Sequence, residues 1–111
     1  MKQGISKMYG FFDFNYENAI FEWDDEKAAS NFKKHGTRFE TASKVFTDEN
    51  KRIWYDEDHP WEERYDILGR TGKILFVVCT FKTGNIVHII SARRATEPEK
   101  PRYEHGEDYD E

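Results

Sequence analysis

Residues 63–94 read ERYDILGRTGKILFVVCTFKTGNIVHIISARR and contain three apolar segments separated by two short turns. The segments are rich in Ile, Val, Leu and Phe, which favour strands, and each turn holds a glycine that can adopt the left-handed backbone of a hairpin. This stretch therefore predicts three consecutive antiparallel strands, at about Glu63–Arg70, Lys73–Phe81 and Asn85–Ala92.

Helix and strand signals surround this stretch on both sides. Asp24 is a favourable N-cap and Gly36 a favourable stop, which together predict a helix that ends at about His35. Thr37 and Glu40 have the spacing of a capping box, which predicts a second helix. The remaining predicted elements are a strand at Ala19–Trp23, the second helix at Arg38–Phe46, a strand at Lys51–Tyr55 and a short helix opened by Thr96–Glu99 that ends near Tyr103.

These elements predict one small α+β domain over residues 19–104. The two helices are expected to form an N-terminal helical hairpin that packs on a mostly antiparallel sheet, and a short helix follows at the C-terminus. Met1–Asn18 is predicted to be a loosely ordered extension and His105–Glu111 an acidic tail. A chain of 111 residues has room for a single domain.

The composition is that of a globular protein with a highly charged surface, 37% hydrophobic and 35% charged. No apolar run reaches the roughly 20 residues of a membrane span, so we expect no membrane partner and a cytoplasmic location. Cys79 is the only cysteine, lies in an apolar run and is predicted to pack in the core. The net charge is −5, but residues 27–52 hold seven Lys or Arg against three acids, which leaves a basic patch for a polyanion.

The lengths of the two turns predict which side chains share a face of the sheet. A two-residue turn places Arg70 opposite Lys73, and a three-residue turn places Lys73 opposite Arg93. These three cations then converge at one end of the sheet, where guanidinium groups can hold phosphate. Surface ion pairs with Asp66 or with the loop 56–58 are the alternative. The predicted polar face comprises Arg64, Asp66, Arg70, Lys73, Ser91 and Arg93, and the predicted apolar face comprises Tyr65, Ile67, Ile74, Phe76, Val78, Ile86, His88 and Ile90.

The four histidines are scattered, and no pair has metal-ligand spacing, so we expect no metal site and no cofactor. His88 is predicted at the edge of the core, and His59 in an exposed loop. His35 follows Lys34 in a last helical turn, where basic residues favour the helix dipole. This structural interpretation stands beside a functional one, in which His35 transfers protons and Lys34 holds a phosphate.

Several short motifs follow one another along the chain in a specific order and spacing. They are Phe21-Glu22-Trp23-Asp24, Lys27-Ala28, Asn31, Lys33-Lys34-His35-Gly36, Phe39-Glu40, Val45-Phe46, Gly69-Arg70 and Ile89-Ile90-Ser91-Ala92-Arg93-Arg94-Ala95. Together they span about Ile20–Tyr103 and resemble the BrnT family, the toxins of the BrnT/BrnA type II toxin–antitoxin systems.

The resemblance implies a small ribonuclease with a RelE-like fold that cleaves cellular RNA and inhibits translation. It also implies a cognate BrnA-like antitoxin with a ribbon-helix-helix DNA-binding part. That antitoxin neutralises the toxin and represses the shared operon, so the toxin contacts DNA only indirectly.

The residues and the resemblance agree on a metal-independent mechanism. The neighbouring 2′-OH of the RNA is the nucleophile, and the protein supplies proton transfer and charge stabilisation. His35, Arg70 and Arg93 are the predicted catalytic residues, and the predicted products are a 2′,3′-cyclic phosphate and a 5′-OH. A non-catalytic module that binds an antitoxin and acts in operon repression is the alternative function. The predicted RNA-binding and phosphate-binding residues are Lys34, Arg64, Lys73 and Arg94.

Overall fold

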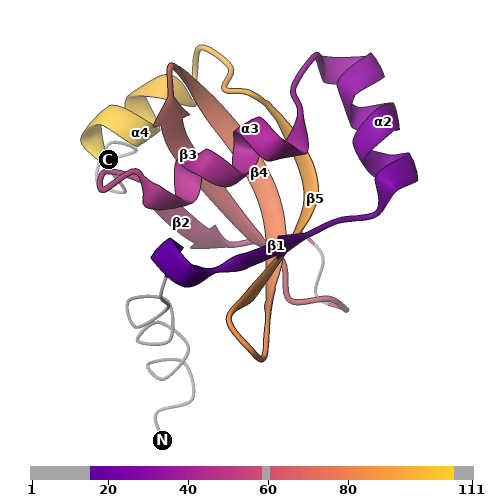
Figure 1. Ribbon diagram of the computed structural model, residues 1–111. Coiled ribbons are helices and arrows are strands. Elements are labelled where there is room, and N and C mark those ends of the chain that lie inside the picture. The colour runs from indigo at the N-terminus through magenta and orange to yellow at the C-terminus, as the bar shows by residue number, and fades with distance from the viewer. Residues whose placement is uncertain (1–15, 59–60, 107–111) are drawn as a thin grey trace, which may run out of the picture.

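A five-stranded sheet in the order β1-β5-β4-β3-β2 forms the centre of the fold (Figure 1). The computed structural model describes residues 16–58 and 61–106. β1 runs parallel to β5 and the other neighbouring strands are antiparallel, which confirms the α+β class and the mostly antiparallel sheet. The strands are β1 (Ile20–Glu22), β2 (Arg52–Tyr55), β3 (Tyr65–Thr71), β4 (Lys73–Lys82) and β5 (Ile86–Arg94).

Helix α2 (Asp25–His35) begins and ends where the sequence predicts. The side chain of Asp24 accepts a hydrogen bond from the backbone N–H of Lys27 at 3.0 Å. Gly36 ends the helix in the left-handed conformation, with φ of 72°, and its N–H donates to the carbonyl of Phe32. Local signals at both ends therefore set the length of this helix.

The second predicted helix is shorter and less regular than expected. It forms α3 (Phe39–Ser43), and the chain continues as the 3-10 helix η2 (Lys44–Thr47). The N-cap of α3 is Arg38, without a side-chain cap hydrogen bond, so the capping box predicted from Thr37 is wrong. The carbonyl of Thr37 instead accepts a hydrogen bond from Asn31 Nδ2 at 3.0 Å. A contact with α2 thus holds the backbone just before α3.

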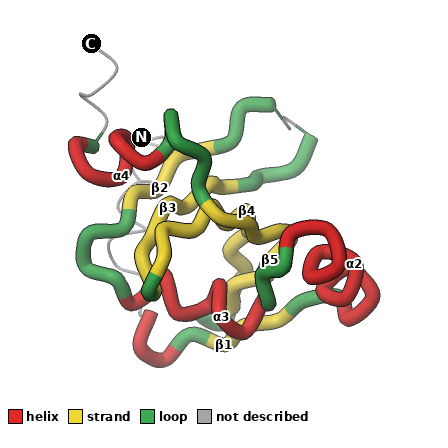
Figure 2. The backbone as a smooth tube through the Cα atoms, turned by 90° about the horizontal axis from the view of Figure 1, so that it is seen from above, coloured by secondary structure: helices red, strands yellow, loops and turns green. Residues whose placement is uncertain are grey.

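Helices cover both faces of the sheet (Figure 2). α3 and η2 pack on one face, and α4 (Lys100–His105) packs on the other through Tyr103. α2 packs against β5, and its pairing with α3 as a helical hairpin is not confirmed. Cys79 is fully buried, as predicted. The core on the α3 face contains Phe39, Ala42, Val45, Phe46, Tyr65, Ile67, Leu75, Val77, Cys79, Val87, Ile89 and Ala92, and the core on the α4 face contains Leu68, Ile74, Ala95 and Tyr103.

The register of the β3–β4 hairpin differs from the predicted one. Thr71 lies opposite Lys73, and Arg70 lies opposite Ile74. Gly72 alone forms the tip of the turn, with φ of 78°, a conformation that favours glycine. The predicted pairing of Arg70 with Lys73 is therefore wrong by one residue.

The register of the β4–β5 hairpin also differs. Its loop comprises residues 83–85, one residue later than predicted, and a β-bulge interrupts the ladder between the two strands. Arg93 consequently lies opposite Phe76, and the predicted pairing of Arg93 with Lys73 is wrong.

These shifts exchange the two faces of β4 relative to β3. Ile67 packs in the core beneath α3, whereas Ile74 and Phe76 pack beneath α4, so the predicted apolar face is divided between the two cores. His88, which the sequence places at the edge of the core, lies between the buried residues Val87 and Ile89. It is partly exposed, and its Nδ1 lies 2.7 Å from Glu22 Oε2.

Three predictions fall wholly or mainly on residues that the structure does not describe. They concern the N-terminal extension, of which only the single 3-10 turn η1 (Tyr16–Asn18) is described, the acidic tail after Gly106, and the loop position of His59. No helix within residues 16–58 and 61–106 combines the length and the apolar surface that crossing a bilayer requires.

Gly69 marks a close approach between β3 and η2. A Cβ atom at position 69 would lie 2.6 Å from the Cβ and 3.1 Å from the carbonyl oxygen of Val45, which is fully buried. We expect Gly69→Ala to lower the free energy of unfolding by about 2 kcal/mol, because the backbone of η2 must move to admit one methyl group. Urea unfolding followed by circular dichroism measures this loss.

Gly36→Ala is the matched control for that substitution. Nothing lies within 4 Å of a Cβ at position 36. The free energy of unfolding of this variant should therefore fall only by the cost of holding alanine in the left-handed conformation, about 1 kcal/mol. A loss at Gly69 no larger than the loss at Gly36 would contradict the close contact.

Candidate nucleic-acid interface

Two adjoining hollows lie at one end of the sheet, where the β3–β4 turn, the end of β5 and the α2–α3 loop meet. Their volumes are about 490 and 390 Å³, within the range of small-ligand sites, roughly 300–1,000 Å³. Lys73 and Arg94 line both hollows. The first is also lined by Phe32, Gly36, Thr37, Arg38, Thr41 and Gly72, and the second by Arg70, Ile74, Ala95, Lys100 and Glu104.

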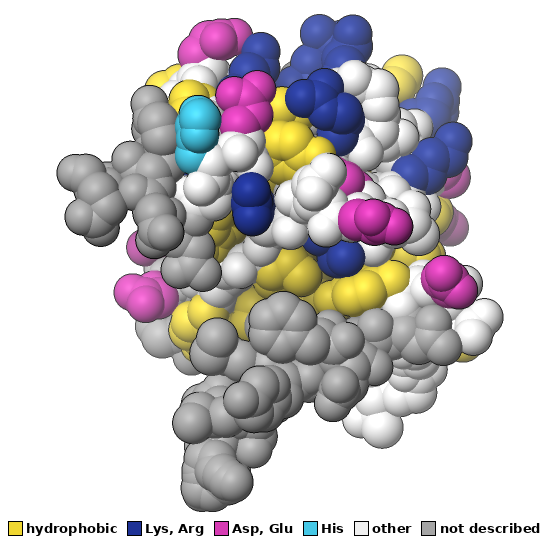
Figure 3. Space-filling model, turned by 90° about the vertical axis from the view of Figure 1, so that its left-hand side faces the viewer, with side chains coloured by type: hydrophobic (Ala, Val, Ile, Leu, Met, Phe, Trp, Pro, Cys, Tyr) yellow, Lys and Arg dark blue, Asp and Glu magenta, His cyan; other side chains and the backbone are white. Residues whose placement is uncertain are grey.

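Four cations line these hollows without a carboxylate partner. Arg38 comes from the α2–α3 loop, Arg70 and Lys73 flank the β3–β4 turn, and Arg94 ends β5. Within residues 16–58 and 61–106, none of the four forms an ion pair. Lys and Arg side chains gather at this end of the molecule, at the top of Figure 3. We call Arg38, Arg70, Lys73 and Arg94 the sheet-end cluster, and it presents positive charge to an anion from solution.

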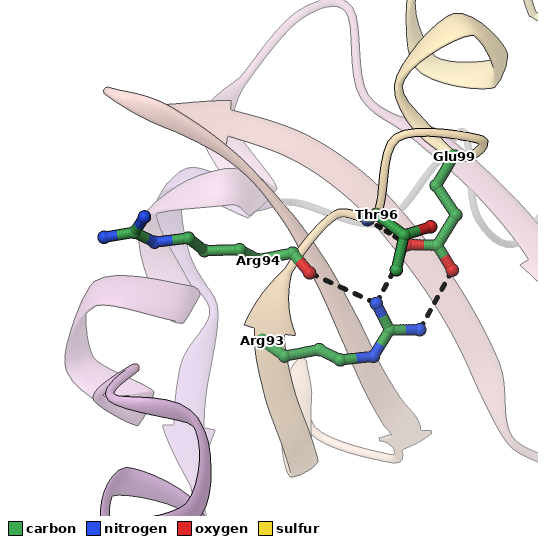
Figure 4. Close-up of polar contacts among 4 residues, drawn as sticks. All are labelled: Arg93, Arg94, Thr96 and Glu99. Carbon is green, nitrogen blue, oxygen red and sulfur yellow. Dashed lines mark hydrogen bonds and ion pairs between the residues drawn. The ribbon is translucent and has the colours of Figure 1, made fainter.

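Arg93 is adjacent to Arg94 in β5, but its side chain points away from that of Arg94 (Figure 4), as neighbouring side chains of a strand do. Its guanidinium donates two hydrogen bonds of 2.9 Å to the two carboxylate oxygens of Glu99 and lies 4.3 Å from the centre of the Phe76 ring. The hydrogen bonds with Glu99 raise the pKa of Arg93 above its ordinary value. Arg93 therefore fastens the segment before α4 to the sheet.

Glu99 also makes one of the hydrogen bonds expected from the capping pattern that the sequence predicts at Thr96–Glu99. Its Oε1 accepts a hydrogen bond from the backbone N–H of Thr96 at 2.9 Å, although α4 itself begins only at Lys100. Burial raises the pKa of Glu99, but the hydrogen bonds from Arg93 and Thr96 outweigh it and lower that pKa below its ordinary value. Glu99 thus stays ionised opposite Arg93 at neutral pH.

The remaining predicted site residues lie apart from one another. Arg64 precedes β3, and its Nε donates to Glu62 Oε1 at 2.8 Å, at the opposite end of the strand from Arg70. Lys34 and His35 are exposed in the last turn of α2, next to Gly36 at the first hollow. The single polar face that the sequence predicts is therefore wrong. The structure brings Arg70, Lys73 and Arg94 together around one hollow and separates Arg64 and Arg93 from them. Lys34 and His35 precede Gly36 in the chain but are not among the residues that line the two hollows.

Asp48 and Tyr103 hold Arg70 in position. Asp48 Oδ2 accepts a hydrogen bond of 2.7 Å from the backbone N–H of Arg70 and one of 2.7 Å from the hydroxyl of Tyr103. The guanidinium carbon of Arg70 lies 5.6 Å from the centre of the Tyr103 ring. Burial raises the pKa of Asp48, but these hydrogen bonds and one from the N–H of Asn50 lower it below its ordinary value. An ionised Asp48 therefore joins η2, the β3–β4 turn and α4.

Asn31 joins the α2–α3 loop to β5. The residue is 8% exposed, and its Nδ2 donates to the carbonyl oxygens of Thr37 at 3.0 Å and Ala92 at 2.8 Å. Its Oδ1 accepts from the N–H of Ala92 at 3.2 Å. These three bonds fix Arg38, one residue after Thr37, relative to Arg94, two residues after Ala92.

Sequence reasoning missed Arg38, Asp48 and Tyr103 as parts of this site. The basic excess of residues 27–52 was a signal for Arg38, because that residue is one of its seven cations. For Asp48 and Tyr103 the sequence offers no comparable signal, since their contacts join residues 55 positions apart.

The alternative prediction, ion pairs with Asp66 or with the loop 56–58, is not found for Arg70, Lys73 or Arg93 in the part of the chain that the structure describes. Burial and the nearby carboxylate of Asp56 raise the pKa of Asp66 to about 6. In the described ranges, no three His, Cys, Asp or Glu side chains are grouped as ligands of a metal ion.

Comparisons with known proteins agree on one family. A family model described as the ribonuclease toxin BrnT of type II toxin–antitoxin systems matches residues 23–99, more than half of the chain. The structure is similar to the crystal structure of the Brucella abortus ribonuclease toxin BrnT, with a TM-score of 0.59 and 20% sequence identity over 72% of this chain and 100% of that chain. At this identity the likeness supports the fold alone. No curated protein matches the sequence.

Proposed function

Because this chain belongs to the BrnT family of ribonuclease toxins of type II toxin–antitoxin systems, we propose that it is a metal-independent endoribonuclease that cleaves cellular RNA and so inhibits translation. We also infer that it acts in the cytoplasm, and that its fold is RelE-like.

The observation that carries this proposal is the sheet-end cluster. Arg38, Arg70, Lys73 and Arg94 are four cations without carboxylate partners among the described residues, grouped around two hollows. Other cations of the chain, such as Arg64, do have such partners. A group of unpaired guanidinium and ammonium groups in a hollow is suited to the phosphates of a nucleic acid strand.

The reaction that fits this site uses the RNA's own 2′-OH. Its oxygen attacks the adjacent phosphorus and gives up a proton, while the bond from phosphorus to the 5′ oxygen breaks and that oxygen takes up a proton. The products are a 2′,3′-cyclic phosphate and a 5′-OH. In the transition state the phosphate oxygens gain negative charge, which Lys73 and Arg94 stabilise because both line both hollows.

The other residues serve positioning and proton transfer. Asp48 and Tyr103 hold Arg70 against the second hollow. His35 lies beside Gly36 at the first hollow and is our candidate for proton transfer, with Lys34 holding the adjacent phosphate. A catalytic role for Arg93 and an RNA contact for Arg64 stay predictions.

We further propose a cognate BrnA-like antitoxin with a ribbon-helix-helix DNA-binding part as the partner. Acidic side chains of that antitoxin would occupy the sheet-end cluster and exclude RNA from it. DNA is then bound only indirectly, through the antitoxin.

RNA cleavage by the purified protein tests the proposed activity. We expect the wild type to cut a defined RNA in excess EDTA and to leave cyclic phosphate and 5′-OH ends. The double variant Lys73→Ala, Arg94→Ala is the matched inactive control, and because both side chains are exposed, its free energy of unfolding should stay within about 0.5 kcal/mol of the wild type.

Two outcomes would change the proposal. Cleavage only in the presence of Mg²⁺ would remove metal independence. A folded wild type that leaves RNA intact under both conditions would favour the non-catalytic module that acts through an antitoxin in operon repression.

A further inference from the structure

Phe32 and Arg38 form a cation–π pair at the first hollow. The guanidinium carbon of Arg38 lies 4.2 Å from the centre of the Phe32 ring, and both residues line the hollow. Phe32 is 41% exposed, which is unusual for so large an apolar side chain. The pair therefore presents flat, partly exposed surface to the space beside Lys73 and Arg94.

Core packing does not account for Phe32. It belongs to neither of the two hydrophobic cores, and the one buried residue of α2 is its neighbour Asn31. Helix termination does not require an aromatic ring either, because Gly36 N–H donates its hydrogen bond to the backbone carbonyl of Phe32 and not to the side chain.

The backbone on both sides of this pair is fixed. The carbonyl of Phe32 accepts the helix-ending hydrogen bond of 2.7 Å from Gly36. Thr37, which precedes Arg38, is buried and is held by Asn31. The backbones that carry the ring and the guanidinium are therefore ordered before a ligand binds, so binding does not have to order them.

Aromatic rings and arginine planes next to phosphate-binding cations are the two parts of a single-strand binding site. Bases of an unpaired strand stack on aromatic side chains or on guanidinium groups, while cations follow the backbone. The first hollow combines both parts, because Phe32 and Arg38 share it with Lys73 and Arg94.

We propose that Phe32 and Arg38 form a stacking site for a nucleobase of single-stranded RNA, adjacent to the phosphate held by Lys73 and Arg94. This inference rests on the proposed function and adds to it a requirement for an unpaired base, because a base inside a duplex has no free face. Thr37 and Thr41 also line the hollow. Stacking on a ring tolerates different bases, so the site selects single strands more than sequence.

Binding of two uncleavable oligomers tests this site. One is a short 2′-O-methyl RNA, which lacks the nucleophilic 2′-OH, and the other is an oligomer of the same backbone without bases. Fluorescence anisotropy gives Kd for each. We expect Phe32→Leu to weaken binding of the base-carrying oligomer about tenfold and to leave binding of the abasic oligomer unchanged, whereas Phe32→Tyr should bind both like the wild type.

A second exposed aromatic residue provides the control. Trp61 is 74% exposed and precedes β3, at the opposite end of that strand from Arg70. Trp61→Leu should leave both Kd values unchanged. Urea unfolding of each variant checks that Phe32→Leu stays folded.

The outcomes separate the base site from the proposed ribonuclease. Equal binding of the base-carrying oligomer by the wild type and Phe32→Leu, with RNA cleavage intact, would overturn the stacking site and leave the proposed function standing. A wild type that neither cleaves RNA nor binds either oligomer would overturn both. Weaker binding of Phe32→Leu to both oligomers alike would assign Phe32 a structural role and overturn the stacking site.

Discussion

Replacement of Asn31 by aspartate is expected to lower the free energy of unfolding by about 4 kcal/mol at neutral pH. Asn31 is almost fully buried, and its Nδ2 donates to the carbonyls of Thr37 and Ala92. A carboxylate of the same shape has no hydrogen to donate, so two carbonyls lose their partner and a negative charge faces both. A domain of this size has a stability of roughly 5–15 kcal/mol, so this one change removes a large part of it. Urea unfolding measures the loss.

The pH dependence of the variant separates charge from lost hydrogen bonds. Burial beside two carbonyls raises the pKa of the new carboxyl in the folded state above its value in the unfolded chain. Stability of Asn31→Asp should therefore fall as the pH rises through that folded pKa and partly recover in acid, relative to wild type. Asn31→Ala, which loses the same bonds without a charge, should cost about 2 kcal/mol and show no such dependence. An Asn31→Asp variant within 1 kcal/mol of wild type at neutral pH would contradict the role of Asn31 in joining the α2–α3 loop to β5.

The elements set by local signals could be predicted from the sequence. Helix α2 has an acceptor at Asp24 and a left-handed residue at Gly36, and both act within one turn of the helix ends. The apolar strands could also be predicted, because their runs of Ile, Val, Leu and Phe are local features of the sequence. The capping box at Thr37 was wrong, because α3 begins one residue later, with Arg38 as its N-cap and no side-chain cap hydrogen bond.

The register of the hairpins could not be predicted, because it depends on backbone geometry in the turns. Gly72 makes the first turn with one residue, and a bulge between Val78 and Cys79 shifts the second ladder. No residue type in these positions marks either feature. Adjacent residues of a strand point to opposite faces, so an odd slip exchanges Arg93 for Arg94 at the site.

Contacts between distant segments were likewise invisible. The hydrogen bond of Tyr103 to Asp48 joins α4 to the end of η2, and the bonds of Asn31 to Ala92 join α2 to β5. Such pairings follow from how the layers pack, which a single sequence does not reveal. The sequence could thus identify a basic site at this end of the sheet, but not the residues that hold its parts in place.

The two neighbouring arginines of β5 should differ in what their removal does. Arg94 is exposed and has no ion pair among the described residues, so Arg94→Ala should leave stability within about 0.5 kcal/mol of wild type. It removes one group that stabilises charge at phosphorus, and the rate of RNA cleavage should fall about 100-fold or more. A fluorogenic RNA measures the rate, and the salt dependence of oligomer binding should lose about one charge in its slope.

Arg93→Ala should instead act through stability, because it removes both hydrogen bonds to Glu99 and the contact with Phe76. We expect a loss of about 2 kcal/mol, since Glu99 is left partly buried without its partner.

Glu99→Gln distinguishes this role from a direct one, because it breaks the ion pair and keeps the Arg93 charge. If Arg93 acts by fastening α4, Glu99→Gln lowers cleavage and stability as Arg93→Ala does, and the salt slope stays unchanged in both. If Arg93 instead touches the phosphate, Glu99→Gln retains cleavage while Arg93→Ala loses it together with one charge in the slope, and the catalytic role predicted from the sequence would hold.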